Sequence, residues 1–132
     1  MKKVEHLGLA VKDIESAIAT YEKLLGSPCY KREVVSNQKV ETAFFKVGET
    51  KIELLSDTSG KGPIAKFIQN RGEGLHHTAY LVDDMNSALQ SLKAKGFSLL
   101  PEYPQKGADN MIVAFLHPKD CSGVLTEICC PM

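Results

Sequence analysis

The stretch HLGLAVKDIESAIATYEKLLG (residues 6–26) returns in altered form as HTAYLVDDMNSALQSLKAKG (residues 77–96). The offset between the two stretches is 77 − 6 = 71 residues. Identical residues fall in register at this offset: His6 with His77, Asp13 with Asp84, Ser16 with Ser87, and Ala17 with Ala88. A pattern that recurs at a fixed offset indicates an internal duplication, and this duplication predicts the architecture of the chain.

Each repeated stretch reads as a strand followed by a helix. Residues 4–11 alternate between two faces, as a strand does. After them, Asp13 stands in the position of a helix N-cap, apolar residues follow at helical spacing, and Gly26 is placed to end the helix. The second stretch repeats this order with Asp84 as the cap and Gly96 as the end.

Three strand-like runs follow each helix. We expect strands near residues 29–34, 40–47 and 51–56 in the first half, and near 97–100, 111–117 and 124–129 in the second. Between the halves, Pro63 opens a short linker helix that ends near Gly72. The sequence therefore predicts an α+β fold made of two tandem βαβββ modules.

The whole chain, residues 1–132, is expected to form one domain. Module one covers about 1–60, the linker helix about 62–72 and module two about 74–130. Because a half this short cannot bury a core alone, we expect the modules to pack as pseudo-symmetric partners.

The charge balance argues against a nucleic-acid binder, because 16 Lys and Arg residues are matched by 16 Asp and Glu residues. No run approaches the roughly 18 apolar residues of a membrane helix. None of the four cysteines forms a CxxC pair, so we expect reduced and mostly buried thiols. We therefore expect a cytoplasmic protein with no nucleic-acid or membrane partner.

His6 and His77 occupy equivalent positions on the first strand of each repeat. A lone histidine in a strand is more often structural than a metal ligand, but a pseudo-twofold axis would bring two equivalent positions together. His76 precedes His77 on the same strand, so its side chain points to the opposite face. We expect a structural or supporting role for His76.

Each half also ends in a strand with one acidic residue among apolar neighbours: Glu53 in KIELL and Glu127 in VLTEI. An exposed edge position explains either residue alone, but a carboxylate in an apolar strand is costly unless it is paired or coordinated. Their matching places in a duplicated fold favour coordination. We expect His6, Glu53, His77 and Glu127 to bind one divalent metal ion such as Co, Ni, Zn, Mn or Mg.

Glu41 lies in QKVETAFF and shares one face of an alternating run with Ala43, Phe45 and Val47. A carboxyl group on an apolar face has a raised pKa and can act as a general base. A glutamate of an edge strand in solvent fits the pattern equally well, so the residues alone leave both roles open.

Four segments carry a family resemblance: HLGLAVKDIESA, VETAFFKVGETKIELL, GLHHTAYLVDD and FLHPKDCSGVLTEI. Through them the chain resembles the vicinal oxygen chelate (glyoxalase/bleomycin resistance/dioxygenase) superfamily, in which paired βαβββ modules form a metal-binding cup. Within this superfamily, the chain looks most like the methylmalonyl-CoA epimerases. This resemblance implies a homodimer and a small-molecule acyl-CoA substrate.

The resemblance places the metal ligands of the family on His6, Glu53, His77 and Glu127, and its two catalytic acid/base positions on Glu41 and Glu127. The implied reaction interconverts the two C2 stereoisomers of methylmalonyl-CoA. One carboxylate takes the α-proton from one face, the metal stabilises the enolate, and an acid on the opposite face returns a proton.

Three other functions fit the sequence less well. Lactoylglutathione lyase, a glyoxalase that acts on the methylglyoxal-glutathione hemithioacetal, shares the four-ligand pattern, but Glu41, the GLHH doublet and the HPKDCSGVL stretch favour the epimerases. A metal-free binding protein of the superfamily typically lacks the ligand set. An extradiol-type dioxygenase usually binds iron through two His and one Glu, so Glu53 counts against it.

Overall fold

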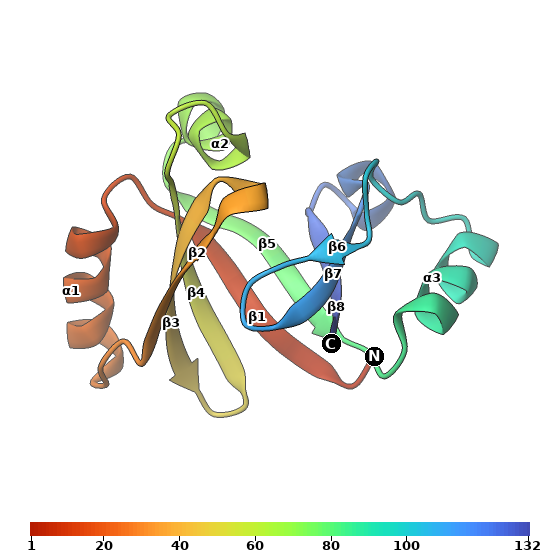
Figure 1. The fold of residues 1–132 in the computed structure, drawn as a ribbon, viewed down its shortest axis with the longest axis horizontal. Coiled ribbons are helices and arrows are strands. Elements are labelled where there is room, and N and C mark those ends of the chain that lie inside the picture. Colours follow the sequence, from red (N-terminus) through yellow and green to blue (C-terminus); the bar gives the residue numbers. More distant parts are fainter. The chain divides into compact units, whose positions relative to one another are not determined.

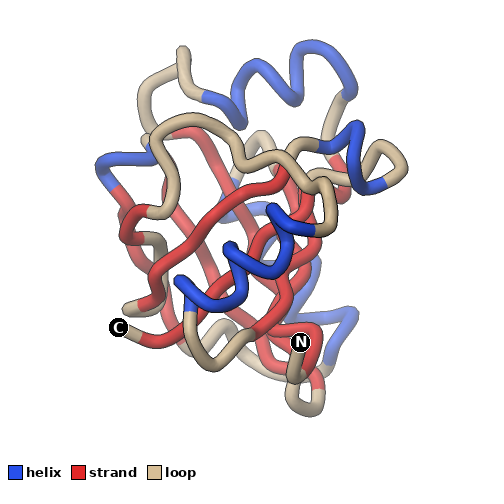
Figure 2. The backbone as a smooth tube through the Cα atoms, turned by 90° about the vertical axis from the view of Figure 1, so that its right-hand side faces the viewer, coloured by secondary structure: helices blue, strands red, loops and turns tan.

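The computed structural model describes all 132 residues and contains three α-helices, two short 3-10 helices (Ser36–Gln38 and Pro118–Cys121) and eight strands. Figure 1 labels these elements along the chain, and Figure 2 distinguishes the helices from the strands. The helices are α1 (Ile14–Leu25), α2 (Pro63–Arg71) and α3 (Met85–Ala94). The strands are β1 (Lys3–Ala10), β2 (Lys31–Val35), β3 (Val40–Val47), β4 (Thr50–Asp57), β5 (Gly74–Leu81), β6 (Gln105–Lys106), β7 (Met111–Leu116) and β8 (Thr126–Pro131). The order βαβββ therefore occurs twice, with α2 between the copies, which confirms the predicted α+β class.

The chain forms two compact units that do not coincide with the two βαβββ repeats. The first unit consists of Met1–His6 with His77–Met132, and the second unit consists of Leu7–His76. Strands β1 and β5 each begin in one unit and end in the other. As a result, both repeat histidines, His6 and His77, belong to the first unit.

Strand pairing within each unit fixes where the predicted acidic residues stand. In the second unit, β2, β3 and β4 are joined by antiparallel pairing, which puts Glu41 on β3 and Glu53 on the neighbouring strand β4. In the first unit, β8 pairs in parallel with β5 and antiparallel with β7. Glu127 of β8 therefore lies between these two strands, opposite Phe115 of β7.

The two repeat helices begin as the sequence predicts. The Asp13 side chain accepts hydrogen bonds from the backbone N–H groups of Glu15 and Ser16, and Asp84 accepts one from Ser87. Gly26 ends α1 with a left-handed φ of 69°, a conformation that glycine adopts without a steric penalty. These caps set the direction in which each helix leaves its first strand.

Replacing Asp13 with alanine is expected to lower the free energy of unfolding by about 1 kcal/mol, because two N–H groups at the start of α1 lose their acceptor. Urea unfolding followed by circular dichroism measures the change. Asp83→Ala is the matched control: Asp83 is exposed and pairs only with Lys2, so its loss should change stability by roughly half as much or less. Equal losses in the two variants would contradict the capping role.

One predicted strand is wrong, since residues 97–100 form no strand. They meet β7 only through an isolated bridge between Leu99 and Leu116, and the strand in this part of the chain is the two-residue β6. Pro101 and Pro104 explain the shift, because proline has no N–H group to give to a strand ladder. The other five strands predicted after the helices are present, with ends shifted by two residues or fewer.

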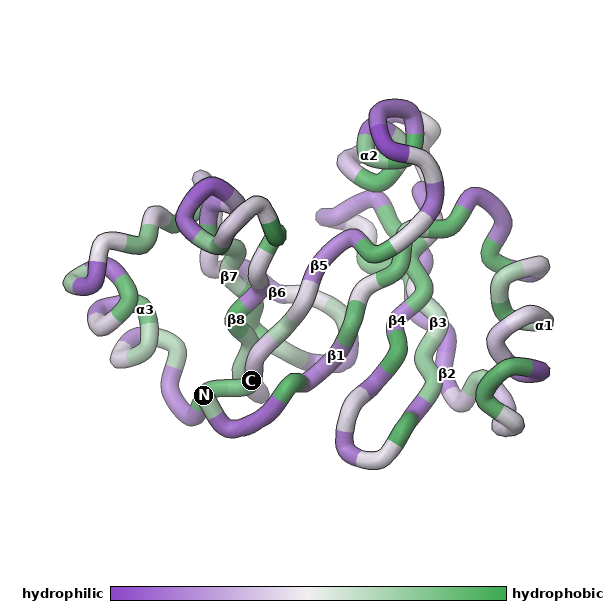
Figure 3. The backbone as a smooth tube through the Cα atoms, turned by 180° about the vertical axis from the view of Figure 1, so that it is seen from behind, coloured by the Kyte–Doolittle hydropathy of each residue, from purple (hydrophilic) through white to green (hydrophobic).

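Each repeat helix covers strands of its own unit with apolar side chains. The buried residues around α1 are Val11, Ile14, Ala43, Phe45 and Leu54, and those around α3 are Val82, Met85, Leu89, Ala114, Leu116, Ile128 and Cys130. Figure 3 shows hydrophobic and hydrophilic residues interleaved along both helices. No helix in the chain is both long enough and apolar enough to cross a membrane.

Candidate metal centre

Three of the four predicted metal ligands meet within the first unit. His6 comes from the middle of β1, His77 from β5 and Glu127 from β8. The Nε2 atoms of His6 and His77 lie 3.1 Å apart. Glu127 Oε1 lies 3.2 Å from His77 Nε2, and Glu127 Oε2 lies 3.5 Å from His6 Nε2. One donor atom from each residue therefore faces a common point.

The burial of these side chains is unusual for their chemistry. Seven polar or charged residues of the chain are buried, and His6, Glu53, His77 and Glu127 are all among them. A buried carboxylate or imidazole costs free energy unless it is paired, hydrogen-bonded or coordinated. Burial therefore separates these four residues from the exposed glutamates of the surface.

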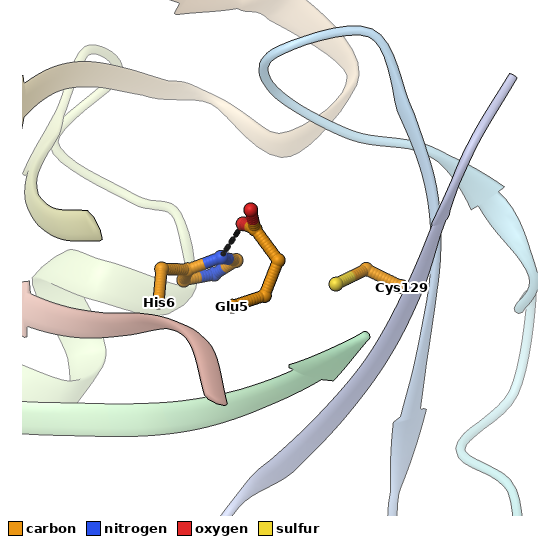
Figure 4. Close-up of side chains that lie close together, drawn as sticks. All are labelled: Glu5, His6 and Cys129. Atoms are coloured by element: carbon orange, nitrogen blue, oxygen red, sulfur yellow. Dashed lines mark hydrogen bonds and ion pairs between the residues drawn. The ribbon is translucent and has the colours of Figure 1, made fainter. Parts of the chain in front are cut away.

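Glu5 fixes the orientation of the His6 ring. Its carboxylate oxygen Oε1 lies 2.8 Å from His6 Nδ1, and the two side chains are 4% and 7% exposed; Figure 4 shows this bond. An ionised carboxylate only accepts, so His6 Nδ1 carries a hydrogen, and the neutral ring then keeps its lone pair on Nε2. That lone pair faces His77 and Glu127, which is the tautomer that a metal ligand needs.

Glu5→Gln is expected to weaken the binding of a divalent metal about 10- to 100-fold, because the neutral amide holds the His6 tautomer less firmly. Competition with a fluorescent chelator measures the dissociation constant. Glu22→Gln makes the same change on α1, where the side chain accepts a bond from the Cys29 N–H, and should leave the constant unchanged. Unchanged affinity in Glu5→Gln would contradict the orienting role.

The two imidazoles determine the ionisation of Glu127. Burial alone would raise the pKa of Glu127, but in the metal-free protein its interactions with the neighbouring imidazoles, above all with the charge of a protonated His6, outweigh burial and lower this pKa to about 2. Glu127 Oε2 is buried and accepts no hydrogen bond. Two facing imidazole nitrogens and an unsatisfied carboxylate oxygen are a donor set that a shared proton or a cation would satisfy.

The low pKa of Glu127 predicts how the stability of the metal-free protein depends on pH. Because the folded-state pKa of about 2 lies below the ordinary 4.5, the ionised carboxylate stabilises the fold above about pH 4.5. This contribution, roughly 3 kcal/mol in size, is lost as the pH falls toward 2. Urea midpoints measured across this range should fall less steeply in Glu127→Gln than in the wild type. Parallel curves would contradict the prediction.

An aromatic ring packs against the His77 imidazole. The Phe115 ring contacts His77 edge-on at 5.4 Å between centroids, and Tyr103 packs on Phe115 at 5.2 Å. Burial raises the pKa of Tyr103, and the Glu127 charge adds to this effect. The apolar surroundings strengthen the electrostatic interactions at the three donor atoms by excluding water.

The fourth predicted ligand, Glu53, is a buried residue of the second unit. It stands on β4 opposite Phe44 of β3. Its apolar, buried position agrees with the expectation drawn from KIELL. Its role as a ligand stays a prediction.

Glu41 has a different environment from the expected apolar face. The residue is half-buried, and Arg32 donates to Glu41 Oε2 through Nε at 3.0 Å and Nη2 at 2.7 Å. Arg32 is held in turn by both carboxylate oxygens of Glu15. This double pairing raises the pKa of the Arg32 guanidinium, with the larger contribution from Glu15. Glu41 is therefore an ion-paired carboxylate whose other oxygen, Oε1, accepts no bond from Arg32.

Comparison with known proteins assigns the chain to a family. Residues 5–115 match the model of the Glyoxalase/Bleomycin resistance protein/Dioxygenase superfamily. The chain is 39% identical over 127 residues to human mitochondrial methylmalonyl-CoA epimerase, covering 96% of this chain and 72% of that protein. It is 37% identical over 128 residues to the ethylmalonyl-CoA/methylmalonyl-CoA epimerase of Cereibacter sphaeroides, covering 96% of each.

A solved structure agrees with these sequence matches. Streptomyces coelicolor methylmalonyl-CoA epimerase in complex with 2-nitronate-propionyl-CoA superposes with a TM-score of 0.93 at 30% identity, covering 99% of this chain and 95% of that chain. The chain belongs to the methylmalonyl-CoA epimerase family. Its fold is the vicinal oxygen chelate fold of the epimerase structures.

His76 is not part of the cluster of metal donors. Its ring packs edge-on against Phe67 of α2 at 4.8 Å between centroids. This contact agrees with the structural role predicted from strand alternation.

None of the four cysteines forms a disulfide in the structure; Cys129 and Cys130 are buried, and Cys29 and Cys121 are partly buried.

Sequence reasoning missed Glu5 and Arg32, which the epimerase fold brings against candidate site residues. Glu5 precedes His6, and alternation along a strand places neighbours on opposite faces. The sequence did contain a signal for Glu5, which is an acidic residue within the strand VEHLGLA. Such a residue needs a partner when it is buried. Arg32 carried no comparable signal, since surface arginines are common.

Proposed function

We propose that this protein is a metal-dependent methylmalonyl-CoA epimerase, which interconverts the two C2 stereoisomers of methylmalonyl-CoA. The observation that carries the proposal is the buried convergence of His6, His77 and Glu127 in the first unit. The substrate class, an acyl-CoA, is proposed from the names of the relatives and from the acyl-CoA ligand in one of their structures.

The donor set fits a divalent metal ion. His6, His77 and Glu127 offer two imidazole nitrogens and one carboxylate oxygen within 4.8 Å of one another. Mixed nitrogen and oxygen donors favour borderline cations such as Zn, Co, Ni or Mn over Mg, which prefers oxygen alone. Such an ion, when bound, would act as a Lewis acid on the oxygens flanking the reacting carbon. Glu53 is proposed as the fourth ligand on the sequence pattern.

The proton is moved by two carboxylates in the proposed mechanism. The α-carbon of methylmalonyl-CoA lies between a thioester and a carboxylate, so its proton is acidified from both sides. Inversion requires that a base removes the proton from one face and an acid returns one to the other. We assign Glu41 and Glu127 to these faces. Arg32 keeps one Glu41 oxygen engaged and thereby orients the other.

The two roles proposed for Glu127 place opposite demands on its pKa. A metal ligand must be ionised, and the pKa of about 2 supports that role. A general base works best with a pKa near the operating pH. The low pKa of Glu127 therefore counts against Glu127 as the base of the first proton abstraction.

No observation in the structure favours the glyoxalase or a metal-free binding function over the epimerase. Four buried predicted ligands are costly for a protein that has no use for them. The homodimer and the cytoplasmic location stay predictions.

Assays with two alternative substrates test the proposed function. The metal-loaded protein is given one pure stereoisomer of methylmalonyl-CoA in one reaction and the methylglyoxal-glutathione hemithioacetal in another. Racemisation of the CoA ester, followed by chiral chromatography, with no product from the hemithioacetal is the expected result. Turnover of the hemithioacetal alone would replace the proposal with the glyoxalase function.

A further inference from the structure

The His6 ring belongs to two groups of potential metal donors. One group is His6 with His77 and Glu127, described above. The other is Glu5, His6 and Cys129, whose donor atoms also lie within 4.8 Å of one another and whose residues are all buried. Figure 4 shows the Cys129 sulfur turned toward the Glu5 and His6 side chains. All three residues belong to the first unit.

The two groups use opposite nitrogens of one imidazole. His6 Nε2 faces His77 and Glu127, and His6 Nδ1 faces Glu5. A neutral imidazole has one nitrogen with a lone pair and one with a hydrogen. A neutral His6 ring can therefore coordinate a cation in only one group at a time. Coordination in both groups would require loss of the remaining N–H proton.

Softness distinguishes the two groups. A thiolate and a carboxylate together cancel the charge of a dication, as the two carboxylates of the first site do with Glu53 as its fourth ligand. A neutral complex is the less costly one in a buried site. Thiolate sulfur also selects soft or borderline cations such as Cd²⁺ or Zn²⁺ over Mg²⁺ or Mn²⁺. The Cys129 group therefore differs from the first in the ion that it favours.

We propose that Glu5, His6 and Cys129 form a second site, for a thiophilic divalent cation, and that this site competes with the first for His6. On binding, the Cys129 thiol releases its proton to solvent and the thiolate bonds to the cation. The hydrogen of the His6 ring moves from Nδ1 to Nε2, and Nδ1 then bonds to the cation. A Glu5 oxygen is the third protein donor. One proton is released in total, and no residue is oxidised or reduced.

The rearranged His6 no longer serves the first site. Its Nε2–H would point at Glu127 Oε2, which lies 3.5 Å away and accepts no hydrogen bond in the present arrangement. The new tautomer thus gains an acceptor, and the first site loses a ligand. Occupation of one site and occupation of the other exclude each other, so thiophilic ions are predicted to act as inhibitors.

Cadmium is the probe, because the Cd²⁺–thiolate bond has a charge-transfer band in the ultraviolet that nitrogen and oxygen ligands lack. Chelator-treated protein is titrated with Cd²⁺ to equilibrium. The wild type is expected to show the band with one equivalent bound. Cys129→Ser should abolish the band, and Glu5→Gln should weaken Cd²⁺ binding about tenfold or more. Cys29→Ser and Cys121→Ser, at the two partly buried thiols, should leave the band intact.

Competition is measured in the same titration. Added Mn²⁺ occupies the first site and should raise the Cd²⁺ concentration needed for the band about tenfold, as reciprocal coupling requires. In His77→Ala, where the first site is broken, Mn²⁺ should have no effect while the Cd²⁺ band persists. The Cd²⁺ band needs no substrate, so its absence would overturn this site without touching the proposed epimerase.

A band of unchanged strength in Cys129→Ser would overturn the second site, and a Mn²⁺-independent band in the wild type would overturn the competition. Far-ultraviolet circular dichroism of each variant checks that it is folded. If Cys129→Ser does not fold, Glu5→Gln made in the His77→Ala background decides the matter, because the first site is broken there and an unchanged Cd²⁺ affinity contradicts the second site.

Discussion

His77→Ala is expected to abolish stoichiometric metal binding and to lower the rate of epimerisation about 1,000-fold, the loss that removal of several kcal/mol of Lewis-acid stabilisation produces. His77 Nε2 is within 3.2 Å of both other donors in the first unit, Glu127 Oε1 and His6 Nε2. Its removal leaves only His6 and Glu127 in this cluster beside the proposed fourth ligand Glu53, and it takes away one of the two imidazole donors that favour a borderline cation. Metal content after gel filtration and the rate of racemisation measure the two effects.

His76→Ala is the matched control for this prediction. His76 is adjacent to His77 in the chain, but its ring packs on Phe67 of α2 in the second unit. The change should cost some stability and leave metal content and rate near those of the wild type. Loss of metal in His76→Ala with retention in His77→Ala would show that the ligand assignment is reversed.

Glu41→Gln is expected to lower the rate of epimerisation between 100- and 10,000-fold, roughly the contribution of a positioned general base, while metal content stays unchanged. The glutamine can still accept bonds from Arg32 but cannot take the α-proton. Activity and metal content measured on one preparation separate the proton-transfer role from the ligand role.

Isotope exchange makes the Glu41 prediction specific to one face of the substrate. If Glu41 serves one face, the variant should lose α-proton exchange from one stereoisomer and keep exchange from the other. Glu33→Gln is the control, because Glu33 is also on a strand of the second unit and pairs with a basic residue, Lys31. Equal exchange from both stereoisomers in Glu41→Gln would remove Glu41 from the mechanism.

The repeat explains why so much of the fold could be predicted. The shared Asp13 and Asp84 cap their helices as local chemistry requires, since a short acidic side chain reaches the free N–H groups of the first turn. The equivalence of His6 and His77 also predicted their proximity, and the Nε2 atoms are 3.1 Å apart. Both inferences depend on positions within a repeat rather than on long-range packing.

Features that depend on contacts between distant strands could not be predicted. The ion pair of Arg32 with Glu41 follows from the antiparallel register of β2 and β3, which periodicity alone does not give. The meeting of Glu5, His6 and Cys129 joins the two ends of the chain. The prediction of a strand at residues 97–100 was wrong. The apolar run favours a strand, but the two prolines that follow it lack the N–H groups that would extend the pairing.

The most direct test of the central claim follows the α-proton itself. The metal-loaded protein is incubated with methylmalonyl-CoA in deuterated water, and α-deuteration is followed by NMR or mass spectrometry beside a chelated sample and a reloaded one. Rapid deuteration with loss of chirality, abolished by the chelator and restored by the metal, is the predicted result. Deuteration that is absent from the loaded protein, or unaffected by the chelator, would contradict a metal-dependent epimerase.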